Sequence, residues 1–181
     1  MSEKYKFRDP DGMYFVTTTT VGWVDVFSRP ELKQVVIGSL RHCQAEKGLL
    51  IHGWCLMPSH LHMIISSVRE PLSGIMRDFK KFTANEAIKL IDTPHESRRS
   101  WMLGLFSEVA DHLKRVSNYK VWQDGNHPIL LARPDIARQK LDYIHNNPVA
   151  EQIVDEPTSY LYSSARDYHT NVKGYLKIDY V

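Results

Sequence analysis

The chain has 181 residues, of which 43% are apolar and 24% are charged, an ordinary balance for a globular protein that excludes wholesale disorder. Its two cysteines are too few for a disulfide framework, and no stretch approaches the roughly 18 apolar residues that a membrane span requires. Residues 69–140 carry 13 Lys and Arg against 9 Asp and Glu, a mild indication of an anionic partner that a solvated charged surface would also explain. The polar first residues are unlike a signal peptide, so we expect a cytoplasmic protein with no membrane partner.

The first half of the chain contains clear strand and helix patterns. Aromatic and β-branched runs predict strands, while apolar residues at three- and four-residue spacing predict amphipathic helices. The predicted elements are a strand at 13–20, a helix from Pro30 to Gly48, strands at 49–57 and 60–66 around a Pro58-Ser59 turn, and a long helix opened by Pro71.

The second half is less regular. A helix is expected to end before Pro148, because the residue that precedes a proline disfavours the helical conformation. The predicted elements are a helical region at 97–118, a strand or irregular hairpin at 121–131, a helix at 134–147, a short helical piece near 160–168 and a last strand at 175–181.

The order of these elements predicts the fold class. Strand, helix, strand, strand, helix, insert and strand is the order of a split βαβ arrangement. We therefore expect an α+β protein with a ferredoxin-like or RRM-like antiparallel sheet and helices packed on it. The absence of repeats and linkers favours one domain over residues 1–181.

The most specific local feature is the pair His60 and His62 in the segment MPSHLHMII. Residues i and i+2 of a strand point to the same face, so both imidazoles project together. Two neutral imidazoles side by side form a ready metal site. Two polar side chains on a wet sheet face, or one buried and one exposed histidine, would give the same pattern.

The second feature is the helix end KLDYIHNNPV. Tyr143 and Asn147 are four residues apart and share a helix face, so a hydroxyl nucleophile lies one turn from an amide that could bind a cation. The same segment is also good helix-stop chemistry, and a helical tyrosine usually packs in an amphipathic interface. By itself, the segment favours this structural interpretation.

Together, the two segments resemble the single-tyrosine HUH (His-hydrophobic-His) transposases, and most closely the IS200-like branch called REP-associated tyrosine transposases. MPSHLHMII and, about eighty residues later, YIHNNPV carry the resemblance, and YFVTTTT, MRDFKKFTANEAI and VWQDGNHPILL support it. The resemblance covers a core of about residues 13–165. It implies the HUH endonuclease fold.

The resemblance also implies roles for four residues. His60 and His62 match the family's metal-binding pair, Tyr143 matches its nucleophile, and Asn147 matches the polar side chain that completes the metal site. The implied cofactor is a divalent metal ion, Mg²⁺ or Mn²⁺, and the implied partner is single-stranded or hairpin DNA. Two imidazoles and an amide form a softer set than Mg²⁺ usually prefers, which favours Mn²⁺.

The implied activity is that of a metal-dependent transposase or endonuclease that cleaves and rejoins single-stranded DNA through a 5′-phosphotyrosine intermediate. A divalent ion stabilises the charge that builds on the scissile phosphate, and a nearby cation also activates a tyrosine hydroxyl. The covalent bond conserves the energy of the broken one, so no ATP is needed. The absence of a Walker GxxxxGK[ST] loop agrees with this.

Basic and aromatic residues in the middle of the chain are the candidate DNA contacts. Lysine and arginine neutralise phosphates, and aromatic rings stack on unpaired bases. For each basic residue a solubilising surface role is an equal alternative, and a tryptophan more often belongs to the core. The candidates are Arg77, Lys80, Lys81, Lys114, Arg115, Lys120, Trp122, Arg133 and Arg138, with Tyr119 and His127 as further stacking candidates.

Two other functions remain open at this point. One is a catalytically inactive, RRM-like nucleic-acid-binding protein derived from such a transposase. The other is a small metal-dependent hydrolase that uses the histidine pair on an unrelated substrate. Tyr143 and Asn147 favour the transposase, because a binding protein has no evident use for either. The resemblance is compatible with both a monomer and a homodimer.

Overall fold

The computed structural model describes residues 6–113 and 118–181, so the candidate DNA contacts Lys114 and Arg115 lie outside the described residues. Within them, an antiparallel sheet has the strand order β2-β3-β1-β4. The strands are β1 (Tyr14–Thr19), β2 (Leu49–Leu56), β3 (His60–Ser67) and β4 (Ile129–Leu130). The helices are α1 (Pro30–Lys47), α2 (Leu72–Ile91), α3 (Arg99–Asp111), α4 (Pro134–Ala150) and α5 (Ala165–His169). This arrangement confirms the predicted α+β class and the ferredoxin-like sheet with helices packed on it.

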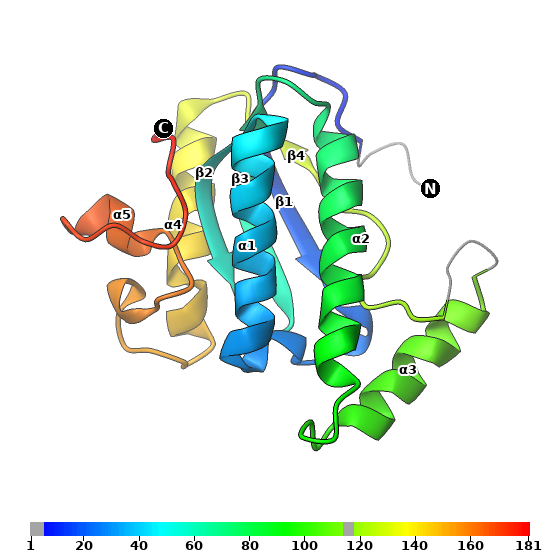
Figure 1. The fold of residues 1–181 in the computed structure, drawn as a ribbon. Helices are drawn as coiled ribbons and strands as arrows, with labels where there is room; N and C mark the ends of the chain where they lie inside the picture. The colour runs from blue at the N-terminus through cyan, green and yellow to red at the C-terminus, as the bar shows by residue number, and fades with distance from the viewer. Residues whose placement is uncertain (1–5, 114–117) are drawn as a thin grey trace.

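The sheet separates two layers of side chains. Alternate residues of β3 point to opposite faces, so Leu61, Met63 and Ile65 join the larger core beneath α1 and α2. Ile64, on the other face, joins a second apolar cluster with residues of α4. Figure 1 shows α1 and α2 side by side over one face, with α4 on the other side of the sheet. The histidines at 60 and 62 share the face of Ile64 and therefore lie on the α4 side.

The boundaries of α1 follow from its sequence. Pro30 occupies the first turn, where its missing N–H costs nothing, and Glu31 complements the positive end of the helix dipole. Gly48 ends the helix in the left-handed conformation, with φ of 74°, and its N–H donates to the carbonyl of Cys43. A glycine is required there also because an added Cβ would lie 2.8 Å from the Cβ of Arg69.

Pro148 does not end α4 as predicted. The helix continues to Ala150, with the proline inside its last turn. Proline lacks only its own backbone N–H, and later residues still donate hydrogen bonds to preceding carbonyls. Glu151 N–H donates to Asn147 O at 3.0 Å, and Ile153 N–H donates to Pro148 O at 2.9 Å. A proline this close to the C-terminus therefore removes one hydrogen bond without stopping the helix.

Four other expectations need correction or refinement. Segment 175–181 is not a strand: it is an extended tail that donates to β2 through Asp179 N–H and Ile51 O at 2.9 Å. Residues 121–131 form neither a full strand nor a hairpin, since only Ile129–Leu130 pairs with β1 and Trp122 makes an isolated bridge to Thr20. Within the predicted helical region at 97–118, of which 114–117 lie outside the described residues, the helix is α3, and the piece near 160–168 corresponds to α5.

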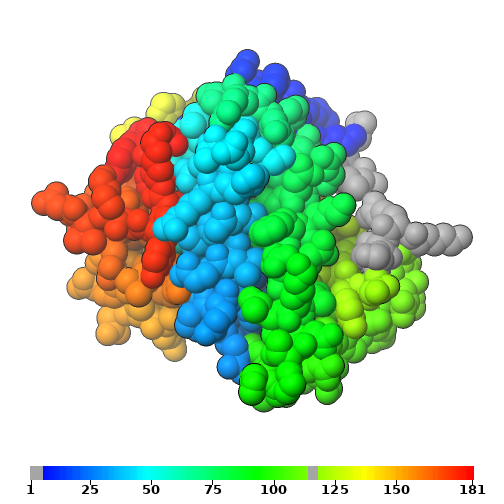
Figure 2. All heavy atoms as spheres, viewed as in Figure 1, coloured from blue at the N-terminus to red at the C-terminus, as the bar shows by residue number. Residues whose placement is uncertain are grey.

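The C-terminal segment covers the outer edge of β2. Leu56 N–H donates to Tyr162 O at 2.8 Å, and Ser164 N–H donates to Trp54 O at 2.9 Å. The last residues then run along α1, as the red segment in Figure 2 shows, where Arg41 and Gln44 donate to carbonyls of the tail. An edge strand covered in this way offers fewer open backbone groups to another chain.

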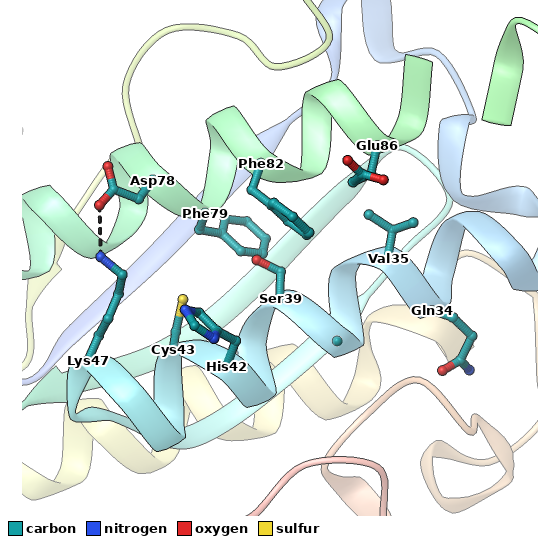
Figure 3. A pocket seen from close by; sticks show the side chains of 11 residues that line it. Gln34, Val35, Ser39, His42, Cys43, Lys47, Asp78, Phe79, Phe82 and Glu86 are labelled. Atoms are coloured by element: carbon teal, nitrogen blue, oxygen red, sulfur yellow. Dashed lines mark hydrogen bonds and ion pairs between the residues drawn. The ribbon is translucent and has the colours of Figure 1, made fainter. Parts of the chain in front are cut away.

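A groove of about 470 Å³ lies between α1 and α2. Figure 3 shows Phe79 and Phe82 of α2 facing Ser39 and Cys43 of α1, with the Lys47–Asp78 ion pair at one end. The groove lies on the side of the sheet away from His60 and His62. None of the residues predicted to bind metal or DNA lines it.

Candidate active site

His60 and His62 lie on β3, paired with Thr19 and Thr17 of β1. Both imidazoles point to the α4 side of the sheet, and their ring centroids are 4.7 Å apart. The two residues are only 7% and 5% exposed. The predicted same-face pair is therefore present, within a mostly buried setting.

Neighbouring hydroxyls orient the two rings. Thr17 Oγ1 lies 2.8 Å from His62 Nδ1, and Ser59 Oγ lies 3.1 Å from His60 Nδ1. Phe15 stacks on the His62 ring with centroids 5.6 Å apart. Protons on the two Nδ1 atoms, donated to these hydroxyls, would leave both Nε2 lone pairs for a cation, which is the usual role of such outer partners.

Burial lowers the pKa of both histidines. The pKa of His62 falls to about 3, chiefly through burial and further through the nearby His60 and Lys140. Burial also lowers the pKa of His60, while its contact with Asn147 and the negative charge of Glu151 act in the opposite direction. Both rings are neutral near pH 7, which is the protonation state that binds metal.

Helix α4 brings the two remaining predicted residues to this pair. Asn147 is 8% exposed, and its Oδ1 lies 3.2 Å from His60 Nε2. Tyr143, one turn earlier, is 48% exposed, and its ring centroid lies 5.3 Å from that of His62. Tyr143 therefore faces solvent at the edge of the site, while Asn147 is buried within it.

Close packing and a buried hydrogen bond hold α4 in this position. Leu141 points at Gly53 of β2, where any Cβ would collide with its Cδ1. Near the other end of the helix, His145 Nε2 lies 2.8 Å from Ser164 Oγ. That hydroxyl also accepts from Trp54 N–H at 2.9 Å, so it links α4 to the middle of β2.

Four residues around the site were not singled out from the sequence. Lys140 lies one turn before Tyr143, with its Nζ 4.8 Å from the centroid of Phe15 and 5.6 Å from that of Tyr143. Its i, i+3 spacing to Tyr143 was a usable signal. Thr17 and Glu151 could not be placed without the strand register and the helix orientation. Trp23 is separated from His60 by 37 residues, and no pattern pointed to it.

Trp122 is a correction to the predicted DNA contacts. Its side chain is 4% exposed, stacks on Phe27 with centroids 5.1 Å apart and donates from Nε1 to Thr83 Oγ1 at 2.9 Å. It belongs to the core beneath α2, so neither face of the indole is open to a base. The apolar environment and the single hydroxyl partner are typical of a buried tryptophan.

Lys80 also differs from the expectation of an exposed phosphate contact. Its Nζ donates to the carbonyls of Gln123 and Gly125 at 2.6 and 2.8 Å, and burial lowers its pKa to about 8. It holds the 123–125 loop against α2. Lys81, the next residue, is exposed.

The other described basic candidates fall into two groups. Arg77, Lys80, Lys81 and Lys120 line one cleft of about 670 Å³ between α2 and the 119–126 segment. Arg133 and Arg138 line another of about 460 Å³ at the start of α4. Acidic neighbours partly neutralise both: Lys120 pairs with Asp124 at 2.8 Å, Arg77 with Asp78 at 2.8 Å and Arg133 with Asp135 at 2.6 Å.

The donor set at the histidine pair fits a divalent ion. Across residues 6–113 and 118–181, no cluster contains three or more His, Cys, Asp or Glu side chains. The set at this site is instead two imidazoles with centroids 4.7 Å apart and one amide oxygen 3.2 Å from His60 Nε2. Such mixed nitrogen and oxygen ligands suit Mn²⁺ better than Mg²⁺ and leave positions open for water or phosphate.

In the part of the chain that the structure describes, no helix is long and apolar enough to cross a bilayer.

Comparisons with known proteins give matches in structure. No protein-family model and no curated protein sequence matches the chain. A REP-associated tyrosine transposase, solved bound to a REP hairpin, superposes with a TM-score of 0.68 at 18% identity, over 100% of this chain and 94% of that one. A candidate transposase from Deinococcus radiodurans R1 has a TM-score of 0.44 at 14% identity, over 80% and 97%, which is too low to support a common fold. The likeness found in the sequence is thus confirmed at the level of architecture: the chain has the fold of a REP-associated tyrosine transposase.

Proposed function

We propose that this protein is a member of the single-tyrosine HUH transposases and cleaves and rejoins single-stranded DNA with Tyr143 as its nucleophile. The observation that carries the proposal is the position of α4. Along this helix, Tyr143 lies beside His62 while Asn147 contacts His60. A helix that served only to cover the sheet would need an apolar residue at the buried position 147, which here holds an amide that contacts His60.

In this proposal, residues of the chain bind the metal ion and the DNA and attack the scissile phosphate. His60, His62 and Asn147 would hold the divalent ion, Mn²⁺ or Mg²⁺, which when bound neutralises charge on the non-bridging oxygens of the scissile phosphate. Tyr143 is half-exposed, so its hydroxyl is the proposed attacking group for a phosphate that enters from solvent. The ammonium of Lys140 adds positive charge on the same side of the helix, where the anionic strand would enter.

The reaction conserves bonds. The hydroxyl of Tyr143 loses its proton as its oxygen forms a bond to phosphorus. The bond from phosphorus to the 3′ oxygen of the preceding nucleotide breaks, and that oxygen takes up a proton, so no net proton is consumed. The products are a 5′-phosphotyrosine and a free 3′-hydroxyl. Attack by a 3′-hydroxyl on the phosphotyrosine reverses the step and joins strands without another energy source.

Single-stranded or hairpin DNA is the proposed partner. The structural neighbour with full coverage was solved with a REP hairpin, which supports this class of ligand. The cleft beside α2, with Arg77, Lys81 and Lys120 on its walls, is the proposed path for the backbone. Which nucleotide each of these residues contacts depends on which DNA strand reaches Tyr143.

The test is formation of a covalent adduct. Wild-type protein, Mn²⁺ and labelled hairpin oligonucleotides from DNA flanking the gene should give a band of slower mobility on a denaturing gel. Tyr143→Phe should abolish that band while Mn²⁺ and DNA binding persist, since one oxygen is removed from a ring that packs as before. Tyr180→Phe, a change to another half-exposed tyrosine in the C-terminal tail, is the matched control and should leave the adduct intact. An adduct formed by Tyr143→Phe, or DNA binding without any adduct in the wild type, would favour another nucleophile or the non-catalytic binding protein.

A further inference from the structure

Trp23 is a large exposed side chain at the edge of the candidate active site. It lies in the 3₁₀ turn Val21–Trp23 that follows β1, and the residue is 61% exposed. Its ring meets that of His60 edge to face, with centroids 5.6 Å apart and planes inclined at 68°. One contact of this kind leaves most of the indole surface open to solvent.

The backbone of Trp23 has an unfavourable conformation at this position. Gly22 has φ of 62° and Trp23 has φ of 56°, so two successive residues occupy the left-handed region. For glycine this costs little, but for a bulky residue it is a genuine outlier of the kind found at ligand sites.

Buried anchors on both sides impose this turn. Val21 and Val24 are buried, and Val21 N–H donates to Val121 O at 2.8 Å. Thr20 Oγ1 lies 2.8 Å from Val24 O and 2.9 Å from Ser59 O, which joins the turn to the start of β3. Because the flanking residues are fixed in the core, Trp23 is held outward beside His60 rather than being a mobile surface residue.

Successive ring contacts connect four side chains. Trp23 contacts His60, His60 contacts His62, and His62 contacts Tyr143, with centroid separations of 5.6, 4.7 and 5.3 Å. Trp23 thus contacts one histidine of the pair and Tyr143 contacts the other. A phosphate held at the histidines would therefore have the nucleophile on one side and the indole on the other.

In-line displacement assigns a nucleotide to the indole. The attacking and leaving oxygens lie on opposite sides of phosphorus, so the leaving 3′ oxygen faces away from Tyr143 and toward Trp23. We propose that Trp23 stacks on the base immediately 5′ of the cleaved bond and so holds the nucleotide that carries the released 3′-hydroxyl. This inference rests on the proposed function, and it deepens that function by assigning a subsite to one nucleotide.

The proposal has a consequence for rejoining. Once the strand is cut, the 5′ fragment has no covalent bond to the protein or to the rest of the DNA, whereas the 3′ fragment is attached through Tyr143. Stacking on Trp23 would keep the released hydroxyl within reach of the phosphotyrosine. Loss of the indole should therefore reduce religation more than cleavage, and should raise KM more than it lowers kcat.

The experiment combines protein and DNA changes. Wild type, Trp23→Ala and Trp23→Phe are compared on a hairpin oligonucleotide that is intact, abasic immediately 5′ of the mapped cleavage site, or abasic immediately 3′ of it. Removing one stacking contact should weaken binding by roughly 5- to 150-fold. Trp23→Ala and the 5′ abasic DNA should each produce this loss, with little further loss when combined, while the 3′ abasic site should add to the loss from Trp23→Ala. Trp23→Phe should restore part of the affinity.

A second measurement does not depend on the alanine variant being folded. 2-Aminopurine placed immediately 5′ of the cleavage site should lose fluorescence on binding to Tyr143→Phe protein, and placed 3′ of it should not. Equal KM and religation for wild type and Trp23→Ala, or a penalty that is independent of which base is missing, would overturn the assignment of Trp23. The absence of any adduct with wild-type protein would instead overturn the proposed function, so the two failures are distinguishable.

Discussion

Asn147 Oδ1 lies 3.2 Å from His60 Nε2, and this contact joins α4 to β3 across 87 residues of sequence. The same helix carries Tyr143, whose ring centroid lies 5.3 Å from that of His62. In the proposed mechanism, the third metal ligand and the nucleophile would therefore be positioned by a single helix.

The first prediction concerns the metal. The double variant His60→Ala/His62→Ala should lose the calorimetric signal for Mn²⁺, because it removes both imidazoles, and Asn147→Ala should weaken binding without abolishing it. His42→Ala, on the exposed face of α1, is the control and should bind Mn²⁺ as the wild type does. Undiminished Mn²⁺ binding in the double variant would place the ion elsewhere.

The second prediction concerns the packing of α4 against β2. In Gly53→Ala, the added methyl group meets Leu141, so that side chain must rotate or the helix must move outward. Overpacking of this kind typically costs about 1–3 kcal/mol of unfolding free energy. The affinity for Mn²⁺ and the adduct yield should both fall, although no proposed ligand is altered.

A matched glycine provides the control for that experiment. Gly38→Ala places a methyl group in α1 that meets no described heavy atom within 4 Å outside its chain neighbours and its own helix backbone, so it should stabilise the protein by about 0.4–1 kcal/mol. Urea unfolding measures both variants. A Gly53→Ala protein with unchanged Mn²⁺ affinity and adduct yield would show that the position of α4 tolerates the substitution.

The third prediction separates two adjacent lysines. Lys81→Ala should weaken single-stranded DNA binding and reduce the salt slope of log affinity by about 1, because an exposed phosphate contact is removed. Lys80→Ala should chiefly lower stability, by about 1–3 kcal/mol, because the carbonyls of Gln123 and Gly125 lose their donor. Fluorescence anisotropy at several salt concentrations and urea unfolding distinguish the two effects. Identical salt slopes for Lys81→Ala and wild type would remove Lys81 from the DNA interface.

The fourth prediction concerns acid stability. Glu96 lies between α2 and α3, where hydrogen bonds from Arg98 and then Arg29 lower its pKa to about 2. Because the folded-state pKa lies below the ordinary value of 4.5, this contribution is complete above about pH 4.5 and is lost as the pH falls toward 2. Glu96→Gln should cost about 1–3 kcal/mol at pH 6, and its difference from wild type should shrink below pH 4.5.

The control for Glu96 is an exposed ion pair. Glu86→Gln breaks a surface contact with Lys89 and should change the unfolding free energy by at most about 1 kcal/mol, both at pH 6 and below pH 4.5. Urea unfolding between pH 6 and the acid limit measures both. A constant difference between wild type and Glu96→Gln across this range would mean that the pairing with the two arginines does not stabilise the fold.

Local periodicity was sufficient for the parts of the site that lie within one element. The two-residue repeat of a strand placed His60 and His62 on one face, and the 3.6-residue repeat of a helix placed Tyr143 and Asn147 on another. The limits of α1 also followed from local rules, since Pro30 and Gly48 act through their own backbone geometry. These relationships depend on neighbours a few residues away, so the sequence determines them directly.

How those faces meet depends on long-range packing. No local rule states that α4 crosses the sheet on the histidine side, that Gly53 admits Leu141, or that Trp23 stands beside His60. The same applies to Trp122 and Lys80, which both fit a DNA surface by residue type. Contacts with α2 bury Trp122, and the ammonium of Lys80 donates to a carbonyl of the 123–125 loop. Pro148 was misjudged because its cost depends on what the following residues can still bond to. Sequence by itself determined which side chains share a face, and long-range packing decided which faces touch, because the burial of apolar surface that drives it is non-directional and summed over the whole chain.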